Sequence, residues 1–195
     1  MVKAPRVGVL ALQGDYGAHL RALADIDIEA VEVRRPQALD HLDGLVLPGG
    51  ESTTHLKLVH RFGFARALDA FVASGRPVLA TCAGLILAAK EVVSPPQGSF
   101  GWLDVRVARN AWGRQVHSFE AHADVCPGFP EPVPLLFIRA PRIERVGPET
   151  EVVLRYQNEP IMVRQGPVVG AAFHPELTPD RRLHRWIFGG LAGRA

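Results

Sequence analysis

Short apolar runs alternate with helical patterns through the first 93 residues of the chain. The runs have the length and hydrophobicity of buried strands, and they occupy residues 5–12, 28–33, 43–47 and 76–80. The helical patterns occupy residues 18–26, a stretch capped by Ser52, residues 64–73 and residues 85–93. This alternation predicts a doubly wound α/β fold, with a mostly parallel central sheet and helices on both faces. Ligands of such folds collect at the carboxyl ends of the strands.

The pattern changes from residue 95 onward. Pro95, Pro96, Gly98 and Gly101 interrupt the chain, and a series of short strand-like segments follows up to Phe173. The second half is therefore expected to be β-rich, with hairpin-like connections. A helix near residues 180–188 closes the chain, and residues 1–195 are expected to form a single domain because no linker or repeat separates them.

Composition narrows the classes of protein that fit. Hydrophobic residues make up 47% of the chain and charged residues 22%, as in an ordinary globular protein. The net charge of +2 has no long basic run behind it, so nucleic acid is not an expected partner. The apolar stretch at 7–12 is too short to span a membrane and lacks a signal-peptide cleavage site, so we expect a cytoplasmic protein. Cys82 and Cys126 have no CxxC spacing, and neither a disulfide nor a metal site is expected.

Cys82 lies where a predicted strand turns sharply into a predicted helix. Such an elbow raises a nucleophile above the sheet, and the start of a helix favours the reactive thiolate. Ala83 and Gly84 are small enough to let a substrate approach, and the amide of Ala83 is a ready oxyanion donor. The alternative is an inert cysteine that packs as a small hydrophobe in the core.

His174 and Glu176 flank Pro175. In an extended segment two residues spaced in this way project to the same side, so the carboxylate of Glu176 can orient the imidazole of His174. Taken alone, a histidine near a glutamate is usually a surface or capping arrangement, and a catalytic pair is the less common case.

Two glycines, Gly49 and Gly50, end the third predicted strand in the sequence LVLPGGESTT. Paired glycines permit backbone conformations that present a free amide to a ligand. The spacings of phosphate-binding loops are absent, and a plain tight turn remains the alternative.

Together these segments resemble the class I glutamine amidotransferases and, within them, the glutaminase subunits of pyridoxal 5'-phosphate synthase. The motifs that carry the resemblance are GVLALQG at 8–14, LPGGESTT at 47–54, TCAGLIL at 81–87, RNAWGRQ at 109–115, HSFEA at 117–121, FIRAP at 137–141 and FHPELTPDRRLH at 173–184. His117 stands where aspartate is expected, and Trp112 where a smaller aromatic residue is common. The resemblance implies a flavodoxin-like, three-layer fold.

The resemblance also implies roles for individual residues. Cys82 would be the nucleophile, His174 the general base and then acid, and Glu176 the group that orients His174. The oxyanion donors would be the amides of Gly50 and Ala83. The residues that match the glutamine-binding positions of the family are Gly49, Gly50, Glu51, Arg109, Ile138 and Arg139.

Partners follow from the same resemblance. Ammonia released from L-glutamine would pass to a synthase subunit that makes pyridoxal 5'-phosphate, in a large hetero-oligomer, and this chain would hold no cofactor of its own. Gln13, at the end of the first strand, would help to form the docking face and couple docking to the oxyanion loop. A simple turn at the strand end is the alternative.

Other functions are compatible with the same residues. The chain could supply ammonia to a different synthase, such as those for histidine or purine precursors, or it could be a non-catalytic regulatory subunit of the same fold. A peptidase-like cysteine hydrolase of similar topology fits the HPE and PGGE sequences less well. Co-purification shows whether the partner is a pyridoxal 5'-phosphate synthase or a different synthase. Glutamate release distinguishes an enzyme from a regulatory subunit.

Overall fold

The structure is a computed structural model that describes residues 4–109, 111 and 118–191. Within these residues the largest sheet has seven strands, in the order β10-β11-β12-β4-β3-β1-β2. The strands of this sheet are β1 (Arg6–Leu10), β2 (Glu29–Val33), β3 (Gly44–Leu47), β4 (Val78–Thr81), β10 (Glu151–Tyr156), β11 (Glu159–Gln165) and β12 (Val168–Ala171). The five strands from β12 to β2 are parallel, and β10 and β11 extend them as an antiparallel edge.

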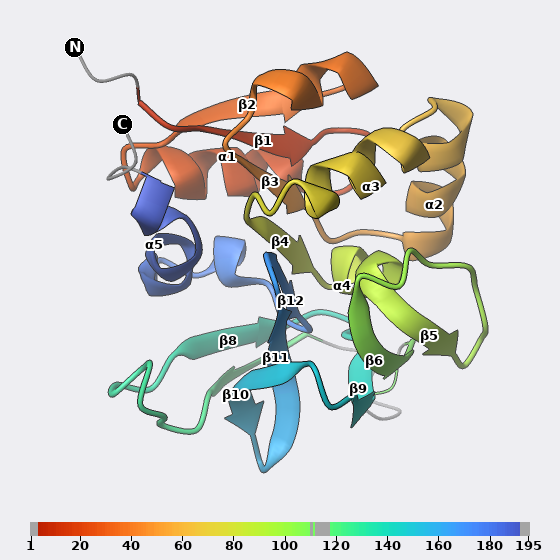
Figure 1. Cartoon of the computed structure of the whole chain (residues 1–195). Helices are drawn as coiled ribbons and strands as arrows, with labels where there is room; N and C mark the ends of the chain where they lie inside the picture. Colours follow the sequence, from red (N-terminus) through yellow and green to blue (C-terminus); the bar gives the residue numbers. More distant parts are fainter. Residues whose placement is uncertain (1–3, 110, 112–117, 192–195) are drawn as a thin grey trace.

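Helices cover both faces of this sheet (Figure 1). Their bounds are α1 (Tyr16–Ala24), α2 (Ser52–Arg61), α3 (Ala65–Ala73), α4 (Ala83–Ala88) and α5 (Arg182–Phe188), and short 3-10 turns are η1 (Pro36–His41), η2 (Pro175–Leu177) and η3 (Gly189–Leu191). Helices α1 and α5 lie on one side of the sheet, and α2, α3 and α4 lie on the other (Figure 1). The predicted three-layer α/β fold is therefore confirmed.

The second half is β-rich, as predicted. A three-stranded sheet joins β5 (Ala89–Val93), β6 (Leu103–Ala108) and β9 (Arg142–Val146), and a hairpin-like pair joins β7 (Phe119–His122) and β8 (Pro134–Phe137). The prediction of one helix over residues 85–93 was wrong, because the helix ends at Ala88 and residues 89–93 form β5. Ala89 leaves the helix in an extended conformation and pairs with Leu103, so tertiary pairing overrides the local helical spacing.

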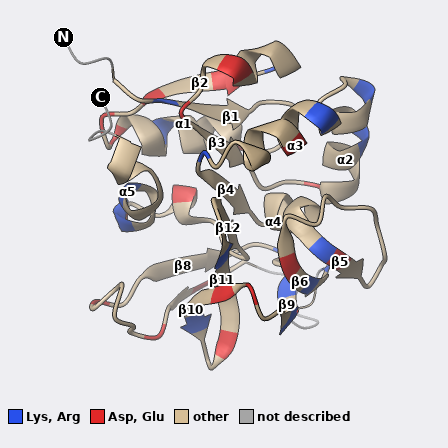
Figure 2. Ribbon diagram, viewed as in Figure 1, with Lys and Arg blue, Asp and Glu red and all other residues tan. Residues whose placement is uncertain are grey.

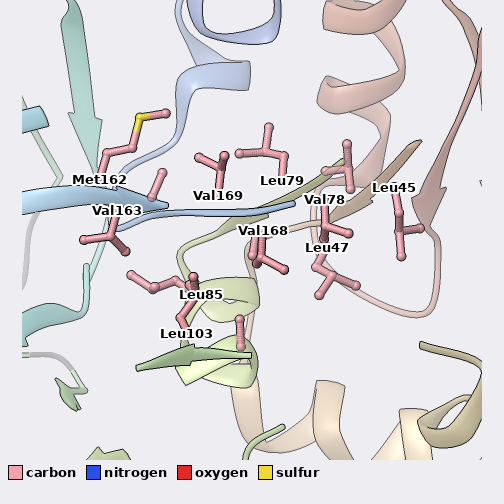
Figure 3. Packing of buried hydrophobic residues seen from close by; sticks show 14 of the residues in the cluster. Leu45, Leu47, Val78, Leu79, Leu85, Leu103, Met162, Val163, Val168 and Val169 are labelled. Carbon is pink, nitrogen blue, oxygen red and sulfur yellow. The ribbon is translucent and has the colours of Figure 1, made fainter. Parts of the chain in front are cut away.

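The core lies on both faces of the central strands. Leu79 and Val169 point to one side of the sheet, whereas Val168 points to the other, toward Leu85 and Leu103 (Figure 3). In each of β3, β4 and β12 all four residues are buried. This burial on both faces explains why the sequences of these strands are nearly continuous apolar runs.

Charged residues lie mostly outside this core. Along the ribbon, Lys, Arg, Asp and Glu positions are scattered over the outer helices and strands, and the central strands carry few of them (Figure 2). Among the described residues, no helix is both long and apolar enough to cross a membrane.

Candidate active site

A cleft of about 320 Å³ opens beside the ends of β3 and β4, where a doubly wound sheet is expected to bind ligands. Its volume lies at the small end of the range for small-molecule sites. All of the catalytic and glutamine-binding residues expected from the sequence line this cleft, with the exception of Ala83, and so do Asp15, Ser52, Ile86 and Leu177, which the sequence did not indicate. Asp15 directly follows the GVLALQG motif, and Leu177 directly follows the HPE sequence. Ser52, Ile86 and Leu177 lie inside the motifs LPGGESTT, TCAGLIL and FHPELTPDRRLH, so motif context is the signal that could have found these residues.

Cys82 forms the elbow between β4 and α4. Its φ of 47° and ψ of −100° are unusual for a residue other than glycine, and such strain is typical of a nucleophile elbow. The backbone holds it from both sides, because Cys82 N–H donates to Ala171 O at 2.8 Å and Ile86 N–H donates to Cys82 O at 3.2 Å. Its thiol lies 4.0 Å from Ile138 O. The backbone of the elbow is thus held in place where the Cys82 side chain lines the cleft.

His174 and Glu176 form the expected pair. His174 Nδ1 donates to Glu176 Oε1 at 2.7 Å, and both residues are buried. The expected extended backbone was wrong, because Pro175 begins the 3-10 turn η2 directly after His174. The fixed φ of proline suits the first position of such a turn. The turn, instead of an extended strand, brings the side chains of His174 and Glu176 into contact.

The protonation of this pair follows from its contacts. Burial alone would lower the pKa of His174, but hydrogen bonds to Cys82 and Glu176 raise it to about 10. Burial would likewise raise the pKa of Glu176, but its hydrogen bond with His174 lowers it. At neutral pH, His174 is therefore an imidazolium beside a carboxylate, with Cys82 on its other side.

The glycine loop after β3 passes against both groups. A methyl group at Gly49 would lie 2.5 Å from His174 Cε1 and 3.4 Å from Cys82 Cβ, so Gly49 packs against His174 with no room for a Cβ atom and lies in contact range of Cys82. Gly50 has a φ of +139°, which L side chains rarely adopt, and a side chain there would collide with Gln13. Gln13 Oε1 also accepts a hydrogen bond from Glu51 N at 3.4 Å. Gln13 is thus in contact with the loop, although it does not line the cleft.

Glu51, rather than Ser52, caps α2. Its carboxylate accepts hydrogen bonds from Thr53 N at 3.1 Å and Thr54 N at 2.7 Å. Its partial burial would raise its pKa, but these two amides lower it to about 2. Ser52 Oγ instead donates to Gln97 Oε1 at 2.9 Å, so the predicted serine cap was wrong. The carboxylate accepts from the two amides through charge-assisted hydrogen bonds, which are stronger than hydrogen bonds to a neutral serine hydroxyl.

The two arginines expected to bind glutamine both lie at the cleft. Arg109 Nη2 lies 3.3 Å from Glu51 Oε1, and its side chain is largely buried. Arg139 has a φ of 44°, a left-handed conformation that costs energy for a residue other than glycine. Like its chain neighbour Ile138, it lines the cleft. The rest of the RNAWGRQ motif, apart from Ala111, lies outside the described residues, as do Trp112 and His117.

Metal chemistry has no obvious donor set in the described part of the chain. No group of three or more His, Cys, Asp or Glu side chains there is placed to hold an ion. The side chains that meet in the cleft offer the chemistry of a thiol with a histidine and a carboxylate, next to backbone amides.

An α/β fold with a cysteine elbow beside a late histidine–glutamate pair is that of the class I glutamine amidotransferases. The model of the SNO glutamine amidotransferase family matches residues 9–191. The chain belongs to this family.

Individual relatives agree with this assignment. The chain is 51% identical over 183 residues to "Pyridoxal 5'-phosphate synthase subunit PdxT" of Frankia casuarinae, covering 93% of this chain and 92% of the relative. It is 44% identical over 190 residues to the protein of the same name in Shouchella clausii, covering 97% of each. A solved structure described as a glutamine amidotransferase superimposes with a TM-score of 0.89 at 46% identity, covering 96% of this chain and 98% of that one. A chain of the PurLQS structure from Thermotoga maritima is only 17% identical, covering 97% of this chain and all of that one, and its TM-score of 0.75 shows a shared fold.

Proposed function

We propose that the chain is the glutaminase subunit of a pyridoxal 5'-phosphate synthase, hydrolysing L-glutamine to L-glutamate and ammonia. The observation that carries this proposal is the meeting of Cys82, His174 and the Gly49–Gly50 loop in one cleft of amino-acid size. The relatives at 44–51% identity are pyridoxal 5'-phosphate synthase subunits by name, which favours this synthase over those for histidine or purine precursors.

The reaction begins with the Cys82 thiolate, which attacks the side-chain carbonyl carbon of glutamine. The resulting oxyanion accepts hydrogen bonds from the amides of Gly50 and Ala83, and losing one such donor typically costs about 100- to 1000-fold in rate. His174 gives its proton to the leaving nitrogen, so ammonia departs and a thioester remains. His174 then takes a proton from water, which attacks the thioester and releases glutamate. Glu176 keeps the imidazole oriented throughout.

Glutamine is held by its amino-acid end. We assign its carboxylate to Arg109 and Arg139, because a guanidinium pairs with a carboxylate through two parallel hydrogen bonds. The ammonium is assigned to Glu51, whose low pKa keeps it charged at any physiological pH. In the structure Arg109 pairs with Glu51. Substrate binding therefore replaces this ion pair with two contacts to glutamine.

Free ammonia would become protonated in water and diffuse away, so the product is useful when a synthase subunit receives it directly. Gln13 is our candidate for linking that partner to the site, because its side chain contacts Gly50 and Glu51 of the oxyanion loop. Replacing Gln13 with alanine should reduce the glutaminase rate measured with the synthase subunit present. An unchanged stimulated rate would remove Gln13 from this role.

The proposed function is tested by glutamate release from glutamine, measured with and without the synthase subunit. Cys82→Ala should lower the rate by at least about 1000-fold, whereas Cys126→Ala, at a cysteine remote from the cleft lining, should retain it. Equal activity of the native chain and Cys82→Ala would refute the mechanism. A rate that does not respond to the synthase subunit would argue against the proposed partner.

A further inference from the structure

A fully buried histidine, His19 of α1, lies directly behind the His174–Glu176 pair. Its Nε2 atom is 3.2 Å from Thr81 Oγ1 and 3.4 Å from Glu176 Oε1. Thr81 is the last residue of β4, immediately before Cys82. The Nε2 atom of His19 thus contacts both Thr81, at the end of the strand that leads into Cys82, and the Glu176 carboxylate that binds His174.

The carboxylate decides which ring nitrogen of His19 carries the proton. A carboxylate can only accept hydrogen bonds, so its contact with Nε2 is attractive only when Nε2 is protonated. The separation of 3.4 Å is long for a hydrogen bond, so the Nε2–H makes a weak, mainly electrostatic contact with Glu176 beside its hydrogen bond to Thr81. His19 Nδ1 has no hydrogen-bond partner among the described residues, so moving the proton to Nδ1 would leave a buried N–H unpaired there and turn the lone pair of Nε2 toward the carboxylate.

The surroundings keep His19 neutral. Burial lowers its pKa, and His174 lowers it further, against the opposing effects of Glu176 and of Asp15 at the cap of its own helix. From α5, the ring of His184 faces it with 6.2 Å between ring centroids. Burial lowers the pKa of His184 to about 4, so this neighbour is also uncharged at neutral pH.

A neutral donor suits this position better than a cation would. A lysine or arginine behind Glu176 would form an ion pair with it and weaken its attraction for the His174 imidazolium. A neutral N–H orients the carboxylate while leaving its negative charge for His174.

We propose that His19 is a positioning residue for glutamine hydrolysis, holding the Glu176 carboxylate in the orientation that receives His174 Nδ1–H. Through Thr81 it also ties this carboxylate to the strand end that carries Cys82. The inference rests on the roles proposed above for His174 and Glu176. It assigns His19 no contact with glutamine.

The test compares three variants of the full chain with the synthase subunit present. His19→Leu removes the donor and should lower kcat about 10-fold, the lower end of the worth of a hydrogen bond to a charged group, because the contact is 3.4 Å long, with KM close to native. His19→Gln can place an amide N–H near the position of Nε2 and should recover most of kcat. His55→Leu is the matched control, because His55 is also fully buried and both its ring nitrogens lack partners among the described residues. This control should retain native kcat.

A second readout separates positioning from packing. The pKa of His174, followed by NMR of its ring nitrogens, should fall in His19→Leu because the hydrogen bond from Nδ1 to Glu176 is weakened. It should stay near native in His55→Leu. Should His19→Leu fail to fold, His19→Asn takes its place, because its shorter amide cannot reach Glu176 whereas that of His19→Gln can.

The outcomes distinguish this inference from the proposed function. Native kcat and a native His174 pKa in His19→Leu, or equal losses in His19→Leu and His55→Leu, would overturn the role of His19. The proposed function would still stand if Cys82→Ala were inactive in the same assay. An active Cys82→Ala would instead overturn the mechanism itself.

Discussion

Replacing Glu176 with glutamine changes one atom of a buried side chain and removes the negative charge that His174 faces. The carboxylate accepts His174 Nδ1–H at 2.7 Å and is almost fully buried, with 1% of the side chain exposed. Glutamine has nearly the same shape, so the variant should fold. It can, however, present either an oxygen or an N–H group to the imidazole.

The magnitude depends on which group faces the ring. If the amide oxygen accepts from Nδ1, the loss is that of a charged hydrogen bond, about 10- to 100-fold in kcat. If the amide N–H faces Nδ1, the imidazole is held in the wrong tautomer, and the analogous change in a serine protease costs about 10,000-fold. We therefore expect Glu176→Gln to lose between about 10- and 10,000-fold in kcat, with a smaller change in KM because Glu176 is assigned no contact with glutamine.

The assay is glutamate release under saturating glutamine, together with the NMR titration of His174. Without the carboxylate, the pKa of His174 should fall well below the value of about 10 that its hydrogen bonds to Cys82 and Glu176 support. Glu29→Gln is the control, since Glu29 pairs with Arg6 on the surface. This variant should have native activity. A Glu176→Gln variant with native kcat, or with an unchanged His174 pKa, would refute the argument.

Gly49→Ala should fold but lose about 100-fold or more in glutaminase rate, because its methyl group would displace His174 and a shift of about 1 Å in a reacting group costs this much. Circular dichroism checks that the variant folds. Native activity of the folded variant would contradict the close packing of Gly49 against His174. Because the pKa of His174 is raised from 6.5 to about 10, its stabilising contribution should be complete below pH 6.5 and be lost as the pH rises through about 10. Urea unfolding should show a steeper alkaline loss for the native chain than for His174→Gln. Burial lowers the pKa of His55 and His184 to about 4, so stability should also fall as the pH drops from 6.5 through 4, and replacing both with leucine should flatten this limb; an unchanged acid limb would contradict their burial as neutral groups.

The architecture could be predicted from the sequence because its strands are buried on both faces. The runs that became β3 and β4 are almost wholly apolar and fully buried, and apolar runs that alternate with helices are typical of a parallel sheet covered on both sides. The prediction for residues 89–93 was wrong because their local pattern does not show that they form a strand. The residues AKEVV continue the helical spacing of the preceding segment, and only the pairing with β6 makes them a strand.

The site was predictable where residues carry distinct chemistry and motif context. Cys82 lies at the predicted elbow, and the contact between His174 and Glu176 is present although their backbone forms a turn. The cap of α2 was predicted wrongly because the sequence does not show that the two carboxylate oxygens of Glu51 face the amides of Thr53 and Thr54. His19 had no signal at all. A single histidine in a helical pattern becomes informative only when folding places it against Glu176, a residue 157 positions later in the chain.

The central claim is that Cys82 attacks glutamine and carries the glutamyl group as a thioester. The most direct measurement is mass spectrometry of the chain quenched with acid during turnover of glutamine. The account predicts a glutamyl adduct on the peptide that contains Cys82, absent from Cys82→Ala and absent from Cys126, the other free cysteine. Sustained glutamate release with the adduct on Cys126, or by the Cys82→Ala variant, would contradict it.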